Sequence, residues 1–170
     1  MTKVYLGLGS NVQPEKHLRL AMVELKKRFR VTATSPVYRN SAVGFEGDEF
    51  CNLVVAMETE LMPGDVCREL DEIHDLAGRR RGDDRFVSRT LDIDLLLYGN
   101  EIIDEPGLHL PREDVLLYSF VLGPLADIAP DLVHPSTGKT IGRHWQDFDR
   151  ANHPLRAEPM DLDNTSRGEA

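Results

Sequence analysis

The chain has 170 residues, a formal net charge of −9, 41% hydrophobic residues and 29% charged residues. This length and composition predict one soluble globular domain with a sizeable core, which we assign to residues 1–147. The negative charge argues against a nucleic-acid or membrane-surface binder, because both functions need a basic face, and no apolar run reaches the roughly 18 residues of a membrane-spanning helix.

The first elements follow a strand-to-helix pattern. Residues 3–9 alternate weakly and run into the polar turn "GLGSN", which predicts a strand. Pro14 then occupies a favoured first-turn position, and the apolar residues after it recur at helical spacing: Leu18, Met22, Leu25 and Phe29. Because "GLGSN" lacks the lysine of a phosphate-binding loop, a simple turn is the favoured interpretation of this segment.

A second round of strands and a helix follows. Residues 30–40 and 50–60 are rich in β-branched or apolar residues and predict two strands. Pro63 begins a second helix, which is expected to stop at Gly78. A charged loop is expected at residues 79–88.

Residues 88–100, "SRTLDIDLLLYGN", complete the series with a strand that ends at a Gly-Asn turn. The resulting order, β-α-β-β-α-β, predicts an α+β fold of the ferredoxin-like type, a two-layer sandwich with helices packed on a mostly antiparallel sheet. Residues 148–170 are polar without a core pattern, which predicts a loose C-terminal tail.

Two aspartates interrupt this last apolar strand. Residues two apart on a strand face the same side, so we expect Asp92 and Asp94 to share one face, with their α-carbons about 6.6 Å apart. The opposite, core-facing side is assigned to Leu91, Ile93, Leu95 and Leu97. Two carboxylates so placed suit Mg²⁺, which takes oxygen ligands and keeps several waters. Ordinary carboxylates on an exposed sheet face are the alternative.

A cluster of arginines directly precedes the aspartates in this acidic protein: Arg79, Arg80, Arg81, Arg85 and Arg89. Guanidinium groups beside a metal suit a phosphate chain, because metal and guanidinium groups can each neutralise some of its oxygens. The two features together favour a Mg²⁺-polyphosphate site over a solvated charged loop.

Phe50 and Asn52 stand two apart in a predicted strand and share one face. An aromatic ring beside a carboxamide could bind a flat heterocycle, with the ring stacking and the amide reading the heterocycle's edge. One core phenylalanine and one polar edge residue is the simpler interpretation of the pair taken alone.

The chain resembles the 6-hydroxymethyl-7,8-dihydropterin pyrophosphokinases of folate biosynthesis in four segments: "GLGSN", "FCNLVVAMET", "GRRR…SRTLDIDLLLYGN" and "FVLGPLADIAPDLVHP". The resemblance covers residues 3–137 and is most specific at "RTLDIDLLLYG". It implies the ferredoxin-like fold, transfer of diphosphate from ATP to the hydroxymethyl group of the pterin, release of AMP, and two Mg²⁺ ions on the ATP.

The resemblance also implies roles for individual residues. Asp92 and Asp94 would be the metal ligands and catalytic residues, together with three phosphate-binding arginines: Arg79, Arg81 and Arg89. The pterin-binding residues would be Val43, Gly44, Phe50, Asn52 and Phe120.

Several positions depart from the usual family pattern, and the loop near residue 41 lacks the usual prolines. Phe86-Val87-Ser88 stands where Trp-Gly-Pro is common, and His74 stands where the second helix usually carries a glutamate. Arg112 and Tyr118 replace a histidine and an arginine. We expect Arg112 to bind ATP phosphates and to supply the positive charge that the family usually obtains from the missing histidine and arginine.

The sequence therefore predicts an ATP- and Mg²⁺-dependent pyrophosphokinase whose partners are two small molecules, ATP and a dihydropterin. A non-catalytic or regulatory pterin-binding paralogue is the first alternative, and an unrelated Mg²⁺-nucleotide phosphotransferase is the second. A monomer is expected, with a dimer as the alternative. Cys51 and Cys67 stand in no metal or redox spacing, which is typical of reduced thiols in a cytoplasmic protein.

Overall fold

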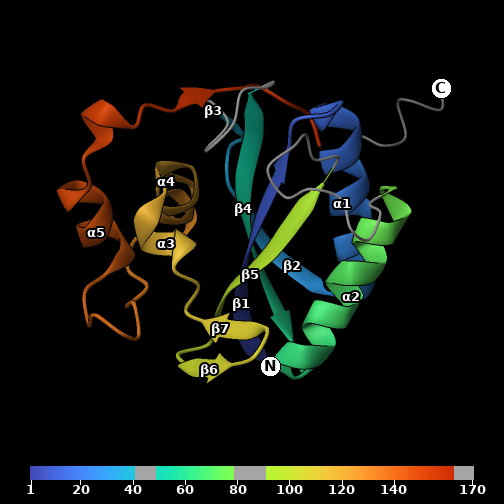
Figure 1. Ribbon diagram of the computed structural model, residues 1–170, viewed down its shortest axis with the longest axis horizontal. Helices are drawn as coiled ribbons and strands as arrows, with labels where there is room; N and C mark the ends of the chain where they lie inside the picture. The colour runs from blue at the N-terminus through green and yellow to red at the C-terminus, as the bar shows by residue number, and fades with distance from the viewer. Residues whose placement is uncertain (41–48, 79–90, 163–170) are drawn as a thin grey trace.

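The computed structural model describes residues 1–40, 49–78 and 91–162, and a mostly antiparallel sheet lies at its centre (Figure 1). Its strands run in the order β5-β1-β4-β3-β8, and β2 also pairs with β4. They are β1 (Thr2–Ser10), β2 (Arg30–Thr34), β3 (Tyr38–Asn40), β4 (Phe50–Thr59), β5 (Asp92–Tyr98) and β8 (Arg156–Ala157). A separate two-stranded sheet is formed by β6 (Ile103–Glu105) and β7 (Leu108–Leu110).

The strand predicted over residues 30–40 is two strands, β2 and β3, which pair with successive parts of β4. Pro36 lies between them and cannot donate to a strand ladder. Ser35 bridges the break, since its N–H donates to the Val54 carbonyl at 2.9 Å and its Oγ accepts from the Val54 N–H at 2.9 Å. The break leaves β3 free to pair with the start of β4, where Asn52 lies opposite Tyr38.

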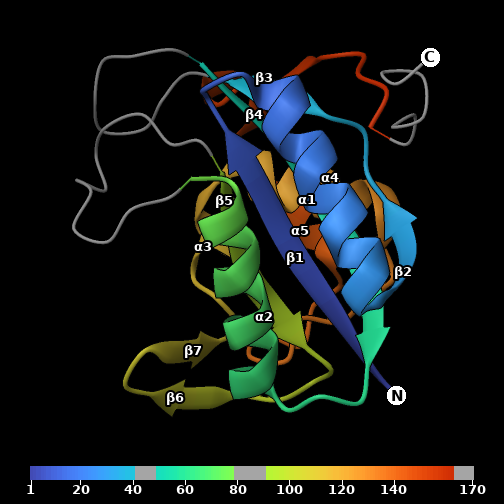
Figure 2. The same ribbon diagram turned by 90° about the vertical axis from the view of Figure 1, so that its right-hand side faces the viewer.

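Helices α1 (Pro14–Arg28) and α2 (Pro63–Leu76) cover one face of the sheet (Figure 2). Both begin at a proline, whose missing N–H is not needed in a first turn. Gly78 follows α2 with a φ of 86°, so the predicted glycine stop is confirmed. The apolar sides of both helices pack with β1, β4 and β5 in one core cluster. The order β5-β1-β4-β2 is that of a ferredoxin-like sandwich, which confirms the predicted fold class.

A further layer lies on the opposite face of the sheet (Figure 1). It consists of α3 (Asp114–Leu117), α4 (Ser119–Ile128) and α5 (Ile141–Asp147). Side chains of these helices pack with Val54, Leu96 and Leu97 in a second core cluster. The predicted two-layer sandwich thus accounts for the chain up to β5. The later helices cover part of the second face of the sheet, which a two-layer sandwich would leave open to solvent. Within the three described ranges, no helix is long and apolar enough to cross a membrane.

An irregularity in β5 moves Leu97 off its predicted face. The β1–β5 register shifts, so that Leu6 lies opposite Leu95 while the preceding residue, Tyr5, lies opposite Leu97. Leu96 is therefore an extra residue, and a bulge of this kind reverses the side-chain alternation that follows it. The other three predicted core residues of the segment lie beneath α1 and α2, but Leu97 lies in the cluster on the α4 side.

The expectation of a loose tail is wrong for residues 148–162. β8 pairs with β3, and Glu158 accepts a 2.8 Å hydrogen bond from Arg39. Leu162 is buried in the core, and the Asp161 carbonyl accepts from Arg19 at 2.7 Å. The physical reason is that the edge of β3 offers unpaired backbone groups, which a short polar segment can satisfy without a hydrophobic pattern. Residues 163–170 lie outside the described part of the chain.

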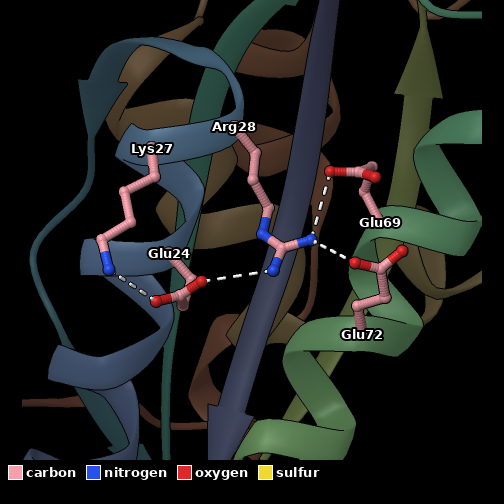
Figure 3. Close-up of polar contacts among 5 residues, drawn as sticks. All are labelled: Glu24, Lys27, Arg28, Glu69 and Glu72. Atoms are coloured by element: carbon pink, nitrogen blue, oxygen red, sulfur yellow. Dashed lines mark hydrogen bonds and ion pairs between the residues drawn. The ribbon is translucent and has the colours of Figure 1, made fainter.

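Arg28 ties α1 to α2 through a network of ion pairs (Figure 3). Its Nη1 lies 3.2 Å from Glu69 Oε1 and 2.9 Å from Glu72 Oε1, and its Nη2 lies 3.3 Å from Glu24 Oε1. Only 19% of the Arg28 side chain is exposed. The network therefore holds two helices side by side, and one of them, α2, also contacts β5.

We expect Arg28→Met to lower the free energy of unfolding by about 1–2 kcal/mol, because three carboxylates lose their shared partner. Lys27→Met is the matched control, since Lys27 is exposed and contacts only Glu24 of this network, and it should cost less than about 0.5 kcal/mol. Denaturant unfolding at low and high salt measures both, and the Arg28 effect should shrink at high salt. Equal stability of the two variants would contradict the network's role.

The contribution of Glu24 to the free energy of unfolding should decrease at low pH. Hydrogen bonds from Lys27 and Arg28 hold the pKa of Glu24 below its usual value. Its contribution is therefore fully present above the usual glutamate pKa of about 4.3 and is lost as the pH falls through the lowered value.

Candidate active site

One row of residues crosses the sheet from β5 to β3. Asp92 lies opposite Gly9 of β1, Gly9 lies opposite Asn52 of β4, and Asn52 lies opposite Tyr38 of β3. Directly opposed residues in antiparallel strands point to the same side. The Tyr38 hydroxyl donates to Asp127 Oδ2 of α4 at 2.5 Å, so this row is on the face that carries α4. The sheet thus brings Asp92 and Asn52 to one face.

Gly7 and Gly9 form the floor between these two groups. A β-carbon at Gly9 would lie 2.6 Å from Asn52 Oδ1, which is closer than such contacts allow, whereas one at Gly7 would lie 3.4 Å from the Leu96 side chain. Only a glycine at position 9 lets the Asn52 amide keep its position. "GLGSN" is therefore neither a phosphate loop nor a simple turn at this point, because Gly7 to Ser10 belong to β1.

Asn52 is buried, and a second amide orients it. Its Nδ2 donates to Asn40 Oδ1 of the neighbouring strand β3. An asparagine amide has two N–H donors and a carbonyl acceptor, so donor and acceptor capacity remains for a ligand. The geometry suits recognition of a heterocycle edge that presents both donors and acceptors.

The aromatic residues predicted to bind the pterin come from two different layers. Phe50 lies in β4 on the same side as Asn52, and both side chains approach the space above Gly9. Phe120 lies at the start of α4, half-buried against the second core cluster. The Tyr118 ring stacks on Phe120 with centroids 5.0 Å apart and an interplanar angle of 16°. Tyr118, one of the departures, therefore supports the orientation of Phe120.

Asp92 and Asp94 share a face as predicted, and both are half-buried. Asp94 Oδ1 lies 3.8 Å from Arg112 Nη2, while Arg112 Nε lies 3.3 Å from Asp114 Oδ2. Burial lowers the pKa of Arg112, but the carboxylates of Asp94 and Asp114 outweigh burial and raise it. Arg112 thus places a permanent positive charge beside the two aspartates.

His74, another departure, lies on α2 behind the aspartates. It is buried, and its Nε2 accepts a 2.8 Å hydrogen bond from the N–H of Ile93, the residue between Asp92 and Asp94. His74 thus contacts the backbone of the aspartate strand.

Five of the predicted site residues lie outside the described residues: Val43, Gly44, Arg79, Arg81 and Arg89. The same holds for Phe86, the first residue of the altered tripeptide. Their assignments as pterin and phosphate contacts stay predictions.

The two aspartates fit a hard divalent cation. Carboxylate oxygens are the ligands that Mg²⁺ prefers, and Asp92 and Asp94 lie opposite Gly9 and Gly7 of β1, which have no side chain of their own. Over residues 1–40, 49–78 and 91–162, no group of three or more histidine, cysteine or acidic side chains could hold a metal. Two carboxylates would then leave the other coordination positions to water and phosphate oxygens, which is the usual arrangement for Mg²⁺ on a nucleotide.

Sequence reasoning missed Gly9, Asn40, Tyr38 and Asp127. The alternation of Gly7 and Gly9 at a strand period was a usable signal for a close approach above β1. No local signal connects Tyr38 with Asp127, which are 89 positions apart and meet only when α4 packs on the sheet.

Comparison with known proteins places the chain in one family. The model of the 7,8-dihydro-6-hydroxymethylpterin-pyrophosphokinase family matches residues 5–130. The 2-amino-4-hydroxy-6-hydroxymethyldihydropteridine pyrophosphokinase of Pseudomonas aeruginosa is 38% identical over 146 residues, covering 84% of this chain and 86% of the relative. The same enzyme of Haemophilus influenzae is 37% identical over 141 residues, which cover 81% of this chain and 88% of that relative. The chain belongs to the 7,8-dihydro-6-hydroxymethylpterin-pyrophosphokinase family.

Solved structures with the same fold are more distant in sequence. Wild-type HPPK-DHPS of Plasmodium falciparum with pterin and p-hydroxybenzoate matches with a TM-score of 0.69 at 15% identity. The match covers 86% of this chain but only 43% of that longer chain. At this identity the likeness establishes the fold alone, and it agrees with the ferredoxin-like sandwich described above.

Proposed function

We propose that this protein transfers diphosphate from ATP to the hydroxymethyl group of 6-hydroxymethyl-7,8-dihydropterin and releases AMP, as a step in folate biosynthesis. The observation that carries the proposal is the row Asp92–Gly9–Asn52. A candidate metal ligand and a candidate pterin-binding amide lie on one sheet face, two strands and thus about 10 Å apart. That separation suits a hydroxymethyl group directed at a metal-bound phosphate chain. The names of the two bacterial relatives describe the same pyrophosphokinase class.

In the proposed reaction the hydroxymethyl oxygen attacks the β-phosphorus of ATP, because the β- and γ-phosphates move together. A bond forms between that oxygen and the β-phosphorus, and the bond from the β-phosphorus to the α–β bridging oxygen breaks. AMP leaves with the bridging oxygen, and the hydroxyl proton passes to solvent. Positioning of the two substrates supplies much of the rate enhancement in such phosphoryl transfers.

Each described site residue has a part in this scheme. The Asn52 amide would fix the orientation of the pterin ring, and Phe50 and Phe120 would stack on it or line its pocket. Asp92 and Asp94 would hold two Mg²⁺ ions, which neutralise phosphate charge when bound. Arg112 would contact the phosphate chain beside Asp94, together with the three arginines predicted from the preceding loop: Arg79, Arg81 and Arg89.

Incubation of the protein with ATP, Mg²⁺ and the dihydropterin, followed by separation of the nucleotides, tests the proposed reaction. We expect AMP in amounts equal to the pterin diphosphate, and none when any one component is left out. AMP without pterin would indicate hydrolysis instead. Binding of a pterin analogue without any AMP would support the non-catalytic paralogue.

Arg112→Ala should raise the Michaelis constant for ATP about tenfold or more and leave the affinity for the pterin almost unchanged. A charge-assisted hydrogen bond to phosphate contributes about 1.5–3 kcal/mol, and each 1.4 kcal/mol is about tenfold in affinity. Arg143→Ala is the matched control, because Arg143 is an exposed arginine of α5 that pairs with Asp147. Steady-state kinetics with each substrate varied in turn will measure both Michaelis constants. A rise in the Michaelis constant for the pterin alone would contradict the assignment of Arg112 to the ATP phosphates.

A monomer and a cytoplasmic location remain predictions. Both cysteines are free in the structure, and burial raises the pKa of the Cys51 thiol and of the Cys67 thiol. Raised pKa values leave little reactive thiolate at neutral pH, which supports the reduced thiols predicted at both positions.

A further inference from the structure

We propose that His74 is a positioning residue for the metal site: through its Nε2 it fixes the backbone of β5 between Asp92 and Asp94. The inference rests on the proposed function, because it concerns how the two aspartates are held for Mg²⁺-ATP.

The first observation is the position of β5 in the sheet. β5 is the first strand in the order β5-β1-β4-β3-β8, so one of its two edges has no neighbouring strand among the described residues. Backbone donors on such an edge need another partner when they are buried. For the Ile93 N–H that partner is His74 Nε2 at 2.8 Å, supplied by α2.

The second observation is the chemistry of the acceptor. A histidine nitrogen accepts a hydrogen bond only when it carries no proton, so the Ile93 contact assigns the proton of neutral His74 to Nδ1. Nδ1 lies 3.4 Å from Asp71 Oδ1, one helical turn earlier on α2. The His74 side chain is buried, with only 7% of it exposed. Ring orientation and acceptor position are therefore both set by the fold.

The third observation is where the contact falls. Ile93 is held from two directions, because its side chain is buried in the core beneath the helices and its N–H is bound to His74. The residues on either side of it, Asp92 and Asp94, project to the opposite face toward the proposed metals. With Ile93 fixed, the pleat that sets the separation of the two carboxylates is fixed as well.

This restraint matters for Mg²⁺ in particular. Mg²⁺ demands near-ideal octahedral geometry at about 2.0–2.1 Å, so small displacements of its ligands weaken binding. Groups that orient metal ligands without touching the metal typically change metal affinity about 10–100-fold when they are removed. His74 acts through one backbone amide, so we expect an effect at the lower end of that range.

The test compares His74→Leu, which removes the acceptor, with His74→Gln, whose amide oxygen can reach the position of Nε2. Mg²⁺ is titrated calorimetrically into each variant saturated with α,β-methylene-ATP, an analogue whose α–β linkage cannot be cleaved. We expect about tenfold weaker Mg²⁺ binding in His74→Leu. In His74→Gln we expect near-wild-type Mg²⁺ affinity. Pterin-analogue affinity should not change in either variant. His109→Leu is the matched control, because His109 is exposed on β7 and faces Asp104.

Two results would overturn the proposal. One is wild-type Mg²⁺ affinity in a folded His74→Leu variant, and the other is equal loss in His74→Leu and His74→Gln, which would indicate packing alone. Amide exchange at Ile93 gives an independent readout and should be faster only in His74→Leu. The AMP assay on the wild-type protein separates this proposal from the proposed function. If the protein makes AMP and His74→Leu binds Mg²⁺ normally, only the role of His74 fails.

Discussion

Asp92→Asn and Asp94→Asn will each lower the rate of AMP release about a hundredfold or more while the protein remains folded. Asparagine keeps the size of the side chain but removes the negative charge that a hard cation requires. A hundredfold loss corresponds to about 2.7 kcal/mol of transition-state stabilisation, which is within the several kcal/mol that a metal supplies to charged oxygens.

The fold should tolerate both changes because neither carboxylate is enclosed in the core. The Asp94 side chain is 41% exposed, and Asp92 is also half-buried, on the same face of the sheet. Asp104→Asn is the control, since Asp104 is an exposed carboxylate of β6 that pairs with His109. Turnover within a few-fold of wild type in either site variant, measured at saturating Mg²⁺, would rule out the metal assignment.

Asn52→Ala and Gly9→Ala should both weaken pterin binding about tenfold or more and leave ATP binding unchanged. The first removes the amide, and leaving a buried ligand group unpaired costs about 1–3 kcal/mol. The second keeps the Asn52 amide but pushes it out of position, because the new methyl group would lie 2.6 Å from Asn52 Oδ1. Two different substitutions on adjacent strands should thus cause the same selective loss.

Gly7→Ala provides a close control for Gly9→Ala. It lies two residues earlier on the same side of β1, where a β-carbon meets the Leu96 side chain at 3.4 Å, an ordinary contact. Calorimetric titration with a pterin analogue and with an ATP analogue should show near-wild-type binding for this variant. A Gly9→Ala protein that is folded and binds the pterin normally would contradict the close approach, and a loss of ATP affinity instead would place the pocket elsewhere.

The structure also changes the meaning of the departures from the family pattern. Arg112 lies 3.8 Å from Asp94 and so brings a positive charge to the proposed metal ligands. Tyr118 stacks on Phe120, a proposed pterin contact. His74 contacts neither substrate region directly but binds the strand between the aspartates. These three described departures therefore support the proposed site.

The sequence by itself determined the local elements and the chemistry of two groups. Helices α1 and α2 were predictable because apolar side chains at helical spacing follow a proline in each. The shared face of Asp92 and Asp94, and that of Phe50 and Asn52, follow from the two-residue period of any regular strand. These are short-range properties, since they depend only on backbone geometry over a few residues.

Only the tertiary structure decided which of these groups meet. The register of β1 with β4 and β5 aligns Asp92, Gly9 and Asn52, and a bulge in β5 moves Leu97 to the α4 side. β8 joins the edge of β3 although its sequence has no core pattern, and His74 reaches Ile93 from a different element. Each of these contacts joins residues far apart in the chain through backbone groups or through the packing of one layer on another. Local periodicity carries no information about such partners, because the same alternation of side chains is compatible with many strand registers.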